Sequence, residues 1–316
     1  MDLYLHIGME KTGTTALQEA VYQNSEMLEE HNIGLFHNIG KPNNRDLVYY
    51  VNSVDLQDDF YTEKGLRTEA EVKHYFQGFE EKFDIRLTEL AGRGISSVII
   101  SSEHFHSRLV KAEDAHRLYE FLRPRFSRIV VILYLRDQVS ACKSLYSTAL
   151  KFGHKTNARD FLNTMRDRYS YFDYGCLIER WSIAFGRENI TVNIFHRSSL
   201  LGGSIITDFF SAIGHADVAE KMSFSKATSN ESLGGVGEAV LKFTNSIFPA
   251  YVDGAYVGRK AIMGKILRKA IMTMFGPFLK LGKIKFDPVA TEAFSAHYRP
   301  LNEKLREEYG IVFPSR

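Results

Sequence analysis

The sequence predicts an α/β protein with a central, mostly parallel sheet flanked by helices. Two segments, 97–102 and 129–135, are short, apolar and rich in β-branched residues, which is typical of strands buried on both faces of a parallel sheet. Segments with helical spacing of apolar residues separate these strands from each other and from a further strand at residues 3–7. Strands that alternate with helices along a chain favour this fold class.

The N-terminal strand leads through a glycine-containing loop into an amphipathic helix that begins at about Thr14. The first N–H groups of a helix have no partner within the helix and can therefore bind an anion. Gly8 and Gly13 allow the backbone to approach a ligand closely and to adopt positive φ. Lys11 adds a mobile positive charge. The segment is therefore predicted to bind a phosphate group, and we expect the helix to end at Gly34.

This loop differs from the triphosphatase pattern G-x-x-x-x-G-K-[ST]. That pattern requires a lysine directly after the second glycine, where this chain has Thr14. Here the lysine lies inside the loop, two residues before Gly13. The spacing therefore argues against a nucleoside triphosphatase.

The composition is that of an ordinary globular protein and excludes several classes. The chain has 316 residues, 44% of them hydrophobic and 25% charged, with a formal net charge of +2. This charge gives no reason to expect nucleic-acid binding. Cys142 and Cys176 form neither a zinc motif nor a disulfide framework. Neither a signal peptide nor an apolar segment of about 20 residues is visible, so we expect a cytoplasmic protein.

Residues 38–70 show poor periodicity and many Asn, Asp and Tyr residues. A long irregular segment inside a compact domain is usually functional. We therefore consider Tyr49, Tyr50 and Tyr61 as stacking surfaces for a bound substrate, with ordinary loop packing an equally good interpretation. A helix is predicted over about 70–92.

Ionisable residues follow the strand at 97–102. Ligands bind at the carboxyl ends of strands in such sheets, which makes Glu103 and His104 candidates for a general base. If the strand continued, its alternation would place Glu103 and Phe105 on one side, with His104 and His106 on the other. The alternative is that these residues cap the next helix or face solvent.

The strand at 129–135 is followed directly by Arg136, and Asp137 is placed to cap the next helix. A preceding helix is predicted over 113–122. Ser144 lies in the helix after Asp137, eight residues beyond Arg136. An arginine fork and a hydroxyl suit a second phosphate group.

Together, the Lys11 loop and the Arg136–Ser144 spacing resemble the sulfotransferases that use 3′-phosphoadenosine-5′-phosphosulfate (PAPS). The resemblance implies a P-loop NTPase-like three-layer fold and sulfuryl transfer to a hydroxyl, or less favourably an amine, of an acceptor. It also implies that Lys11 stabilises the leaving oxygen and that no metal is required. The donor's 5′-phosphate would be held by the loop, and its 3′-phosphate by Arg136 and Ser144. The implied donor-binding residues of the loop are Lys11, Thr12, Gly13, Thr14 and Thr15.

Further residues extend the resemblance toward carbohydrate sulfotransferases, which have an N-x-S element near the donor. Asn230 and Ser232 match that element, and Lys226 lies nearby. The predicted helix and strand between 172 and 192, and the helix at 207–213, follow the family order. Residues 195–200 lack the acid of the family's E-D-L loop, so what packs there is left open.

Eight Lys or Arg residues and no acid occupy residues 254–286. On a helical wheel Lys265, Arg268 and Lys269 share a sector opposite Ile262, Ile266, Ala270 and Met274, and Gly276-Pro277 interrupts the pattern. Such a region suits an anionic acceptor or the inner surface of a membrane. A helix with a solvated basic face is an equally good interpretation.

We therefore expect one sulfotransferase domain over 1–316, with an insertion at 38–70 and a basic helical region at 254–316. Lys11 is expected to be catalytic. For the general base, Glu103 is the first candidate and His104 is the second. The expected acceptor is a glycan or glycolipid. Two alternatives stay open: a P-loop kinase, and a non-catalytic protein that binds PAPS or its product 3′,5′-adenosine bisphosphate (PAP).

Overall fold

The computed structural model describes residues 1–36, 43–223, 233–252, 255–256 and 258–314. The chain divides into two compact units, and each is described by itself. Unit 1 comprises Met1–Arg136, Asp173–Ala227 and Lys304–Arg316, and unit 2 comprises Asp137–Phe172 and Thr228–Glu303. The expectation of one domain with insertions stays a prediction.

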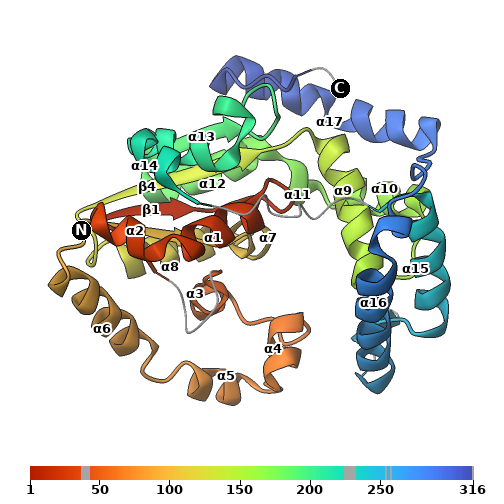
Figure 1. The fold of residues 1–316 in the computed structure, drawn as a ribbon, viewed down its shortest axis with the longest axis horizontal. Coiled ribbons are helices and arrows are strands. Elements are labelled where there is room, and N and C mark those ends of the chain that lie inside the picture. Colours follow the sequence, from red (N-terminus) through yellow and green to blue (C-terminus); the bar gives the residue numbers. More distant parts are fainter. Residues whose placement is uncertain (37–42, 224–232, 253–254, 257, 315–316) are drawn as a thin grey trace. The chain divides into compact units, whose positions relative to one another are not determined.

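Unit 1 contains a five-stranded parallel sheet in the order β2-β3-β1-β4-β5 (Figure 1). The predicted α/β fold with a mostly parallel sheet is therefore confirmed. From the central strand the chain winds first toward β2 and later toward β5, so the loop after β1 lies at the reversal point where such sheets bind ligands. The strands are β1 (Asp2–His6), β2 (Ile33–Leu35), β3 (Ser97–Ser101), β4 (Arg128–Leu135) and β5 (Ile190–Ile194).

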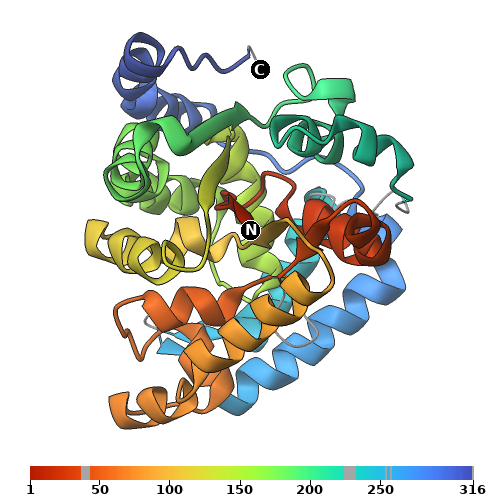
Figure 2. The same cartoon turned by 90° about the vertical axis from the view of Figure 1, so that its left-hand side faces the viewer.

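Helices cover both faces of this sheet (Figure 2). On one face, β4 residues Val130, Ile132 and Tyr134 pack in one apolar cluster with α1 (Thr14–Gln23), α2 (Ser25–Glu30), α13 (Ile205–Ala212) and α14 (Ala216–Lys221). The alternate β4 residues face the other way, where α12 (Tyr174–Phe185) contacts β4, β5 and α8 (Ala112–Leu122). The sequence pattern predicted β3, β4, β5, α8 and α12 well.

The N-terminal helix is shorter than predicted. Asn24 is the C-cap of α1, with non-helical φ of −108°, and its side-chain amide also donates to the Ala20 carbonyl oxygen. A separate helix α2 follows, and Gly34 lies inside β2 rather than at a helix end. A side chain at Gly34 would press against Leu90 and Ile95, which explains the glycine there.

The described part of the 38–70 segment is helical rather than irregular. It contains α3 (Arg45–Val51) and α4 (Asp59–Lys64), and α5 (Glu69–Tyr75) and α6 (Phe79–Gly92) replace the single helix predicted over 70–92. Gly78, with φ of 71°, separates the last two. Tyr49 and Tyr61 are buried and pack on Phe60, with the Tyr49 and Phe60 rings stacked at a centroid distance of 4.0 Å. The packing interpretation therefore holds for these two tyrosines.

Unit 2 is mainly helical and has a two-stranded antiparallel sheet. Asp137 caps α9, accepting a hydrogen bond from the Ser140 N–H as predicted. The elements are α9 (Gln138–Lys151), α10 (Ala158–Asp167), α11 (Tyr169–Phe172), α15 (Gly235–Ile247), β6 (Tyr251–Val252), β7 (Ala255–Tyr256), α16 (Gly258–Leu279) and most of α17 (Pro288–Tyr309). None of the described helices has the length and hydropathy needed to cross a membrane.

The basic sector that the helical wheel placed on α16 is only partly exposed to solvent. Arg268 is 2% exposed and donates from Nη1 to Asn245 Oδ1 and to the Phe248 carbonyl oxygen, each at 3.1 Å. Gly153 and Gly264 leave room for its guanidinium. Ile262, Ile266 and Met274, which the wheel placed opposite the basic sector, are exposed. Pro277 lies within the helix, which continues to Leu279.

Candidate functional site

The loop between β1 and α1 has an unusual backbone at two residues. Lys11 has φ of 69° and Gly13 has φ of 78°, both in the left-handed region. Thr12 lies between them and is fully buried, and its hydroxyl donates to the Met9 carbonyl oxygen at 2.6 Å. The loop is therefore fixed from within by Thr12. Gly13 is the N-cap of α1, so the first amides of this ten-residue helix lie at the loop.

Arg136 ties the end of β4 to this loop. Its Nη1 donates to the Lys11 carbonyl oxygen at 2.9 Å, and its guanidinium carbon lies 5.8 Å from the centroid of the Phe195 ring. Tyr174 contacts both sides of the junction, since its hydroxyl donates to the Arg136 carbonyl oxygen at 2.8 Å and lies 3.2 Å from the Met9 sulfur. Two parts of the predicted donor site are thus in direct contact.

Glu103 lies at the carboxyl end of β3, beside the start of helix α7 (His104–Arg108). Gln18 Nε2 donates to Glu103 Oε2 at 3.0 Å and to Ser101 Oγ at 3.2 Å. Ser101 Oγ also lies 2.8 Å from Nδ1 of His6, the last residue of β1. A buried polar network therefore connects the candidate base with the helix that follows the Lys11 loop.

Because β3 ends at Ser101, the strand alternation does not reach residues 103–106. His104 and Glu103 are not on opposite sides: His104 Nε2 lies 4.0 Å from Glu103 Oε1. Burial lowers the pKa of His104 to about 4, although the Glu103 carboxylate opposes this shift. His104 is therefore neutral near pH 7. Its Nδ1 is buried and has no hydrogen-bond partner among the described atoms.

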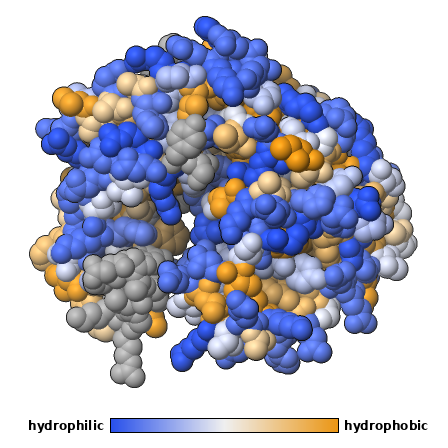
Figure 3. Space-filling view, turned by 180° about the vertical axis from the view of Figure 1, so that it is seen from behind, coloured by the Kyte–Doolittle hydropathy of each residue, from blue (hydrophilic) through white to orange (hydrophobic). Residues whose placement is uncertain are grey.

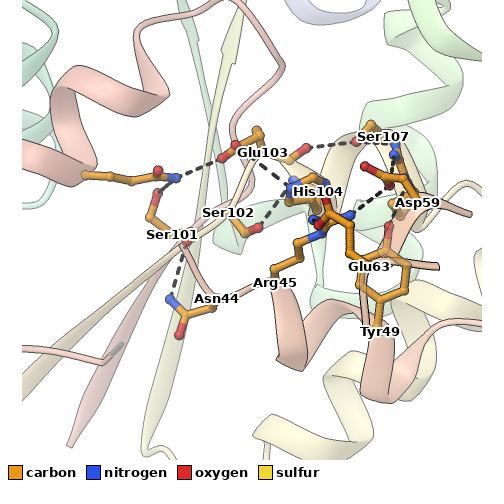
Figure 4. A network of polar contacts seen from close by, with 12 residues as sticks. Asn44, Arg45, Tyr49, Asp59, Glu63, Ser101, Ser102, Glu103, His104 and Ser107 are labelled. Atoms are coloured by element: carbon orange, nitrogen blue, oxygen red, sulfur yellow. Dashed lines mark hydrogen bonds and ion pairs between the residues drawn. The ribbon is translucent and has the colours of Figure 1, made fainter. Parts of the chain in front are cut away.

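A cluster of ion pairs beside His104 was not predicted from the sequence (Figure 4). Arg108 Nε and Asp58 Oδ2 are 2.6 Å apart, and Arg45 Nη2 and Asp59 Oδ1 are 2.7 Å apart. Burial alone would lower the pKa of Arg108, but the oxygens of Tyr49 and Asp58 raise it above its ordinary value. These partners come from α3, α4 and α7, far apart in sequence, so no local pattern indicates them.

The structure brings four predicted residues to one edge of the sheet: Lys11, Glu103, His104 and Arg136. They follow the adjacent strands β1, β3 and β4, whose carboxyl ends share that edge. Ser144 is buried in α9 of unit 2, so its pairing with Arg136 of unit 1 stays a prediction. Lys226, Asn230 and Ser232 lie outside the described residues.

The loop at 195–200, where the family acid is missing, uses an acid from α13 instead. Asp208 Oδ1 accepts a hydrogen bond from the Leu201 N–H at 2.9 Å, and Asp208 Oδ2 accepts one from the Tyr134 hydroxyl at 2.7 Å. Asp208 therefore links the end of this loop to β4. Asp208 is thus the acid found beside this loop, where the sequence alone left open what packs.

No protein-family model and no curated protein matches the chain. Among solved structures, a sulfotransferase from Alicyclobacillus acidocaldarius is similar, with 17% identity and a TM-score of 0.46. The match covers 76% of this chain and 90% of that one. At this level of similarity, the function has to be inferred from the residues of the site.

Proposed function

We propose that the protein transfers a sulfuryl group from PAPS to an acceptor hydroxyl. The observation that carries the proposal is the contact between Arg136 and the Lys11 carbonyl oxygen, at the sheet edge where Glu103 also lies. One edge thus combines an anion-binding loop, a fixed guanidinium and a carboxylate. These are the groups that transfer of a charged group to a hydroxyl requires.

The donor site consists of the loop and the residues around it. Amides at Gly13, Thr14 and Thr15 hold the 5′-phosphate, as the start of a helix does for other anions. Lys11 stabilises charge on the bridging oxygen as the bond to sulfur breaks. Arg136 and Ser144 bind the 3′-phosphate, which distinguishes PAPS from ATP. In this proposal Thr12 contributes by shaping the loop, because its hydroxyl is bonded to Met9.

Glu103 is the general base in this proposal. It takes the proton of the acceptor hydroxyl as the oxygen attacks sulfur, and PAP leaves with the bridging oxygen. Gln18 positions the carboxylate through the hydrogen bond to Oε2. His104 is the second candidate; its lowered pKa makes it a weak base, although it stays neutral at pH 7 and is able to accept a proton.

The proposed acceptor is a glycan or glycolipid. This part rests on the resemblance of Asn230 and Ser232 to the N-x-S element of carbohydrate sulfotransferases. The ion-pair cluster of Arg45, Asp59, Arg108 and Asp58 adds many hydrogen-bonding groups beside His104. Sugar hydroxyls are bound by such polar groups, which supports the same acceptor class.

The donor part is tested by binding, without knowledge of the acceptor. Isothermal titration calorimetry compares PAP with ADP, which lacks the 3′-phosphate. We expect PAP to bind about 10-fold tighter or more, because its second phosphate is on the 3′-oxygen, whereas that of ADP is on the 5′-phosphate, and only the 3′-phosphate gains charge-assisted hydrogen bonds to Arg136 and Ser144, worth about 1.5–3 kcal/mol. Arg136→Ala should remove most of this difference and, in turnover, chiefly raise the Michaelis constant for the donor.

The matched control is Arg128→Ala, which removes an exposed arginine at the opposite end of the same strand. It should leave the preference for PAP unchanged. Equal affinity of the wild-type protein for PAP and ADP, or a preference for magnesium-ATP, would exclude the 3′-phosphate site and favour the kinase alternative.

A further inference from the structure

One side of α16 exposes a set of apolar side chains. The side chains of this set fall within a sector of about 160° on the helix, since successive residues are about 100° apart. Their exposed fractions range from 39% for Leu267 to 71% for Met274. We call this set the apolar face of α16: Ile262, Met263, Ile266, Leu267, Met274 and Phe278.

The opposite side of α16 is fixed by polar contacts as well as by apolar packing. Arg268 is buried against Asn245 and Phe248, and Ala261 and Leu279 are buried on the same side. The helix is therefore not free to turn its apolar face inward, because that would expose Leu279 and pull Arg268 from its two hydrogen bonds. The exposure is a property of how unit 2 packs.

Positive charge borders this apolar face. Lys265 and Lys269 are exposed at one edge of the sector, and Lys280, Lys283 and Lys285 are exposed just beyond the helix. Residues 254–286 contain eight basic residues and no acid.

Figure 3 shows one side of the molecule, where hydrophobic residues lie singly or in small groups among hydrophilic ones.

We propose that the apolar face of α16 docks on the surface of an anionic phospholipid bilayer. Apolar side chains would enter the boundary between headgroups and acyl chains, while the bordering lysines reach the lipid phosphates with their long stems. A second copy of the chain fits less well, since a two-fold contact would bring the same acid-free basic segment against itself. A bilayer satisfies both the apolar area and the charge.

Vesicle sedimentation tests this proposal directly. The full chain is mixed with vesicles of phosphatidylcholine alone or of phosphatidylcholine with phosphatidylglycerol. We expect binding to the anionic vesicles, weakened by added salt, and little binding to the neutral ones. Ile266→Ser with Met274→Ser, and separately Lys265→Glu with Lys269→Glu, should each weaken binding about 10-fold or more.

The matched controls change exposed residues of the same type in unit 1. Ile183 is 73% exposed on α12, and Lys82 is exposed on α6, so Ile183→Ser and Lys82→Glu should bind like wild type. The proposal fails if the wild-type protein does not bind anionic vesicles, if it binds both kinds of vesicle equally, or if the control variants lose binding as much as the α16 variants.

It also fails if analytical ultracentrifugation shows a dimer that the double substitution Ile266→Ser with Met274→Ser dissociates. Thermal unfolding of every variant identifies any that no longer folds; a serine pair that unfolds is replaced by Met263→Gln.

Discussion

At the scale of single residues, the Lys11 loop could be predicted because its chemistry depends on residue types at short spacing. Lys11, Gly13 and Arg136 were all identified from such spacing. The left-handed backbone of Lys11 was not, since nothing about a lysine indicates positive φ. The ion pairs of Arg45 and Arg108 were missed for a related reason: their partners are acids on other helices, and one sequence does not show which acid meets which arginine.

Gly13 offers a test of the loop at this scale. A Cβ there would lie 2.8 Å from the Phe195 ring, and its φ of 78° strains any other residue. Gly13→Ala should therefore destabilise the protein by about 1–3 kcal/mol and weaken PAP binding about 10-fold or more, as seen by calorimetry.

The control variant Gly65→Ala separates the effect of backbone strain from the effect of a close contact with a neighbouring side chain. Gly65 has φ of 73°, but a Cβ there would meet nothing within 4 Å. It should show the backbone cost alone and bind PAP normally. Unchanged binding in Gly13→Ala would show that the loop conformation does not matter for the donor.

At the scale of elements, strands and helices with strong periodicity were predicted, and those that depend on tertiary contacts were not. β3 has an apolar, β-branched centre and β4 is apolar after Arg128, so their sequence alone identifies them. The short helices α3 and α4 are stabilised by aromatic packing around Tyr49 and Phe60, which a periodicity count does not detect. In α16 the wheel found two sides but could not show which one faces Asn245 and Phe248.

The link between α1 and the end of β3 gives the prediction at this scale. Gln18→Ala removes the hydrogen bond to Glu103 Oε2 and the one to Ser101 Oγ. We expect kcat to fall about 10-fold with little change in the Michaelis constant for the donor.

Gln23→Ala is the matched control, since Gln23 is exposed at the end of the same helix. It should leave both kcat and the Michaelis constant for the donor unchanged. If Gln18→Ala changed only thermal stability and left kcat as in wild type, Gln18 would be structural rather than a positioning residue.

At the scale of the whole molecule, buried histidines make stability depend on pH. Burial lowers the pKa of His6 to about 3 and that of His104 to about 4, from an ordinary value of 6.5. The unfolded chain therefore binds protons on both residues at pH values where the folded chain does not. The contribution of these two residues to stability is therefore fully present above pH 6.5 and is lost as the pH drops toward 4 and then 3.

His6→Asn should flatten this acid dependence in urea unfolding series, by about 1.4 kcal/mol for each unit by which the pKa of His6 is lowered. The slope of the unfolding free energy against pH is compared, rather than the free energy itself, because the substitution also changes packing. His74→Asn, at an exposed histidine of α5, should leave the slope as in wild type. An unaltered slope in His6→Asn would mean that His6 does not titrate in this way.

The central claim is sulfuryl transfer with Lys11 at the reacting group. The most direct measurement is transfer of label from radiolabelled PAPS to polysaccharide, lipid and small-molecule fractions of a host-cell extract. We expect label in the polysaccharide or lipid fraction, and a loss of about 100-fold or more in Lys11→Ala. Lys111→Ala, at an exposed lysine before α8, should transfer at the wild-type rate. Near wild-type transfer by Lys11→Ala would contradict the mechanism, and tight PAP binding without transfer to any fraction would identify a binding protein instead of an enzyme.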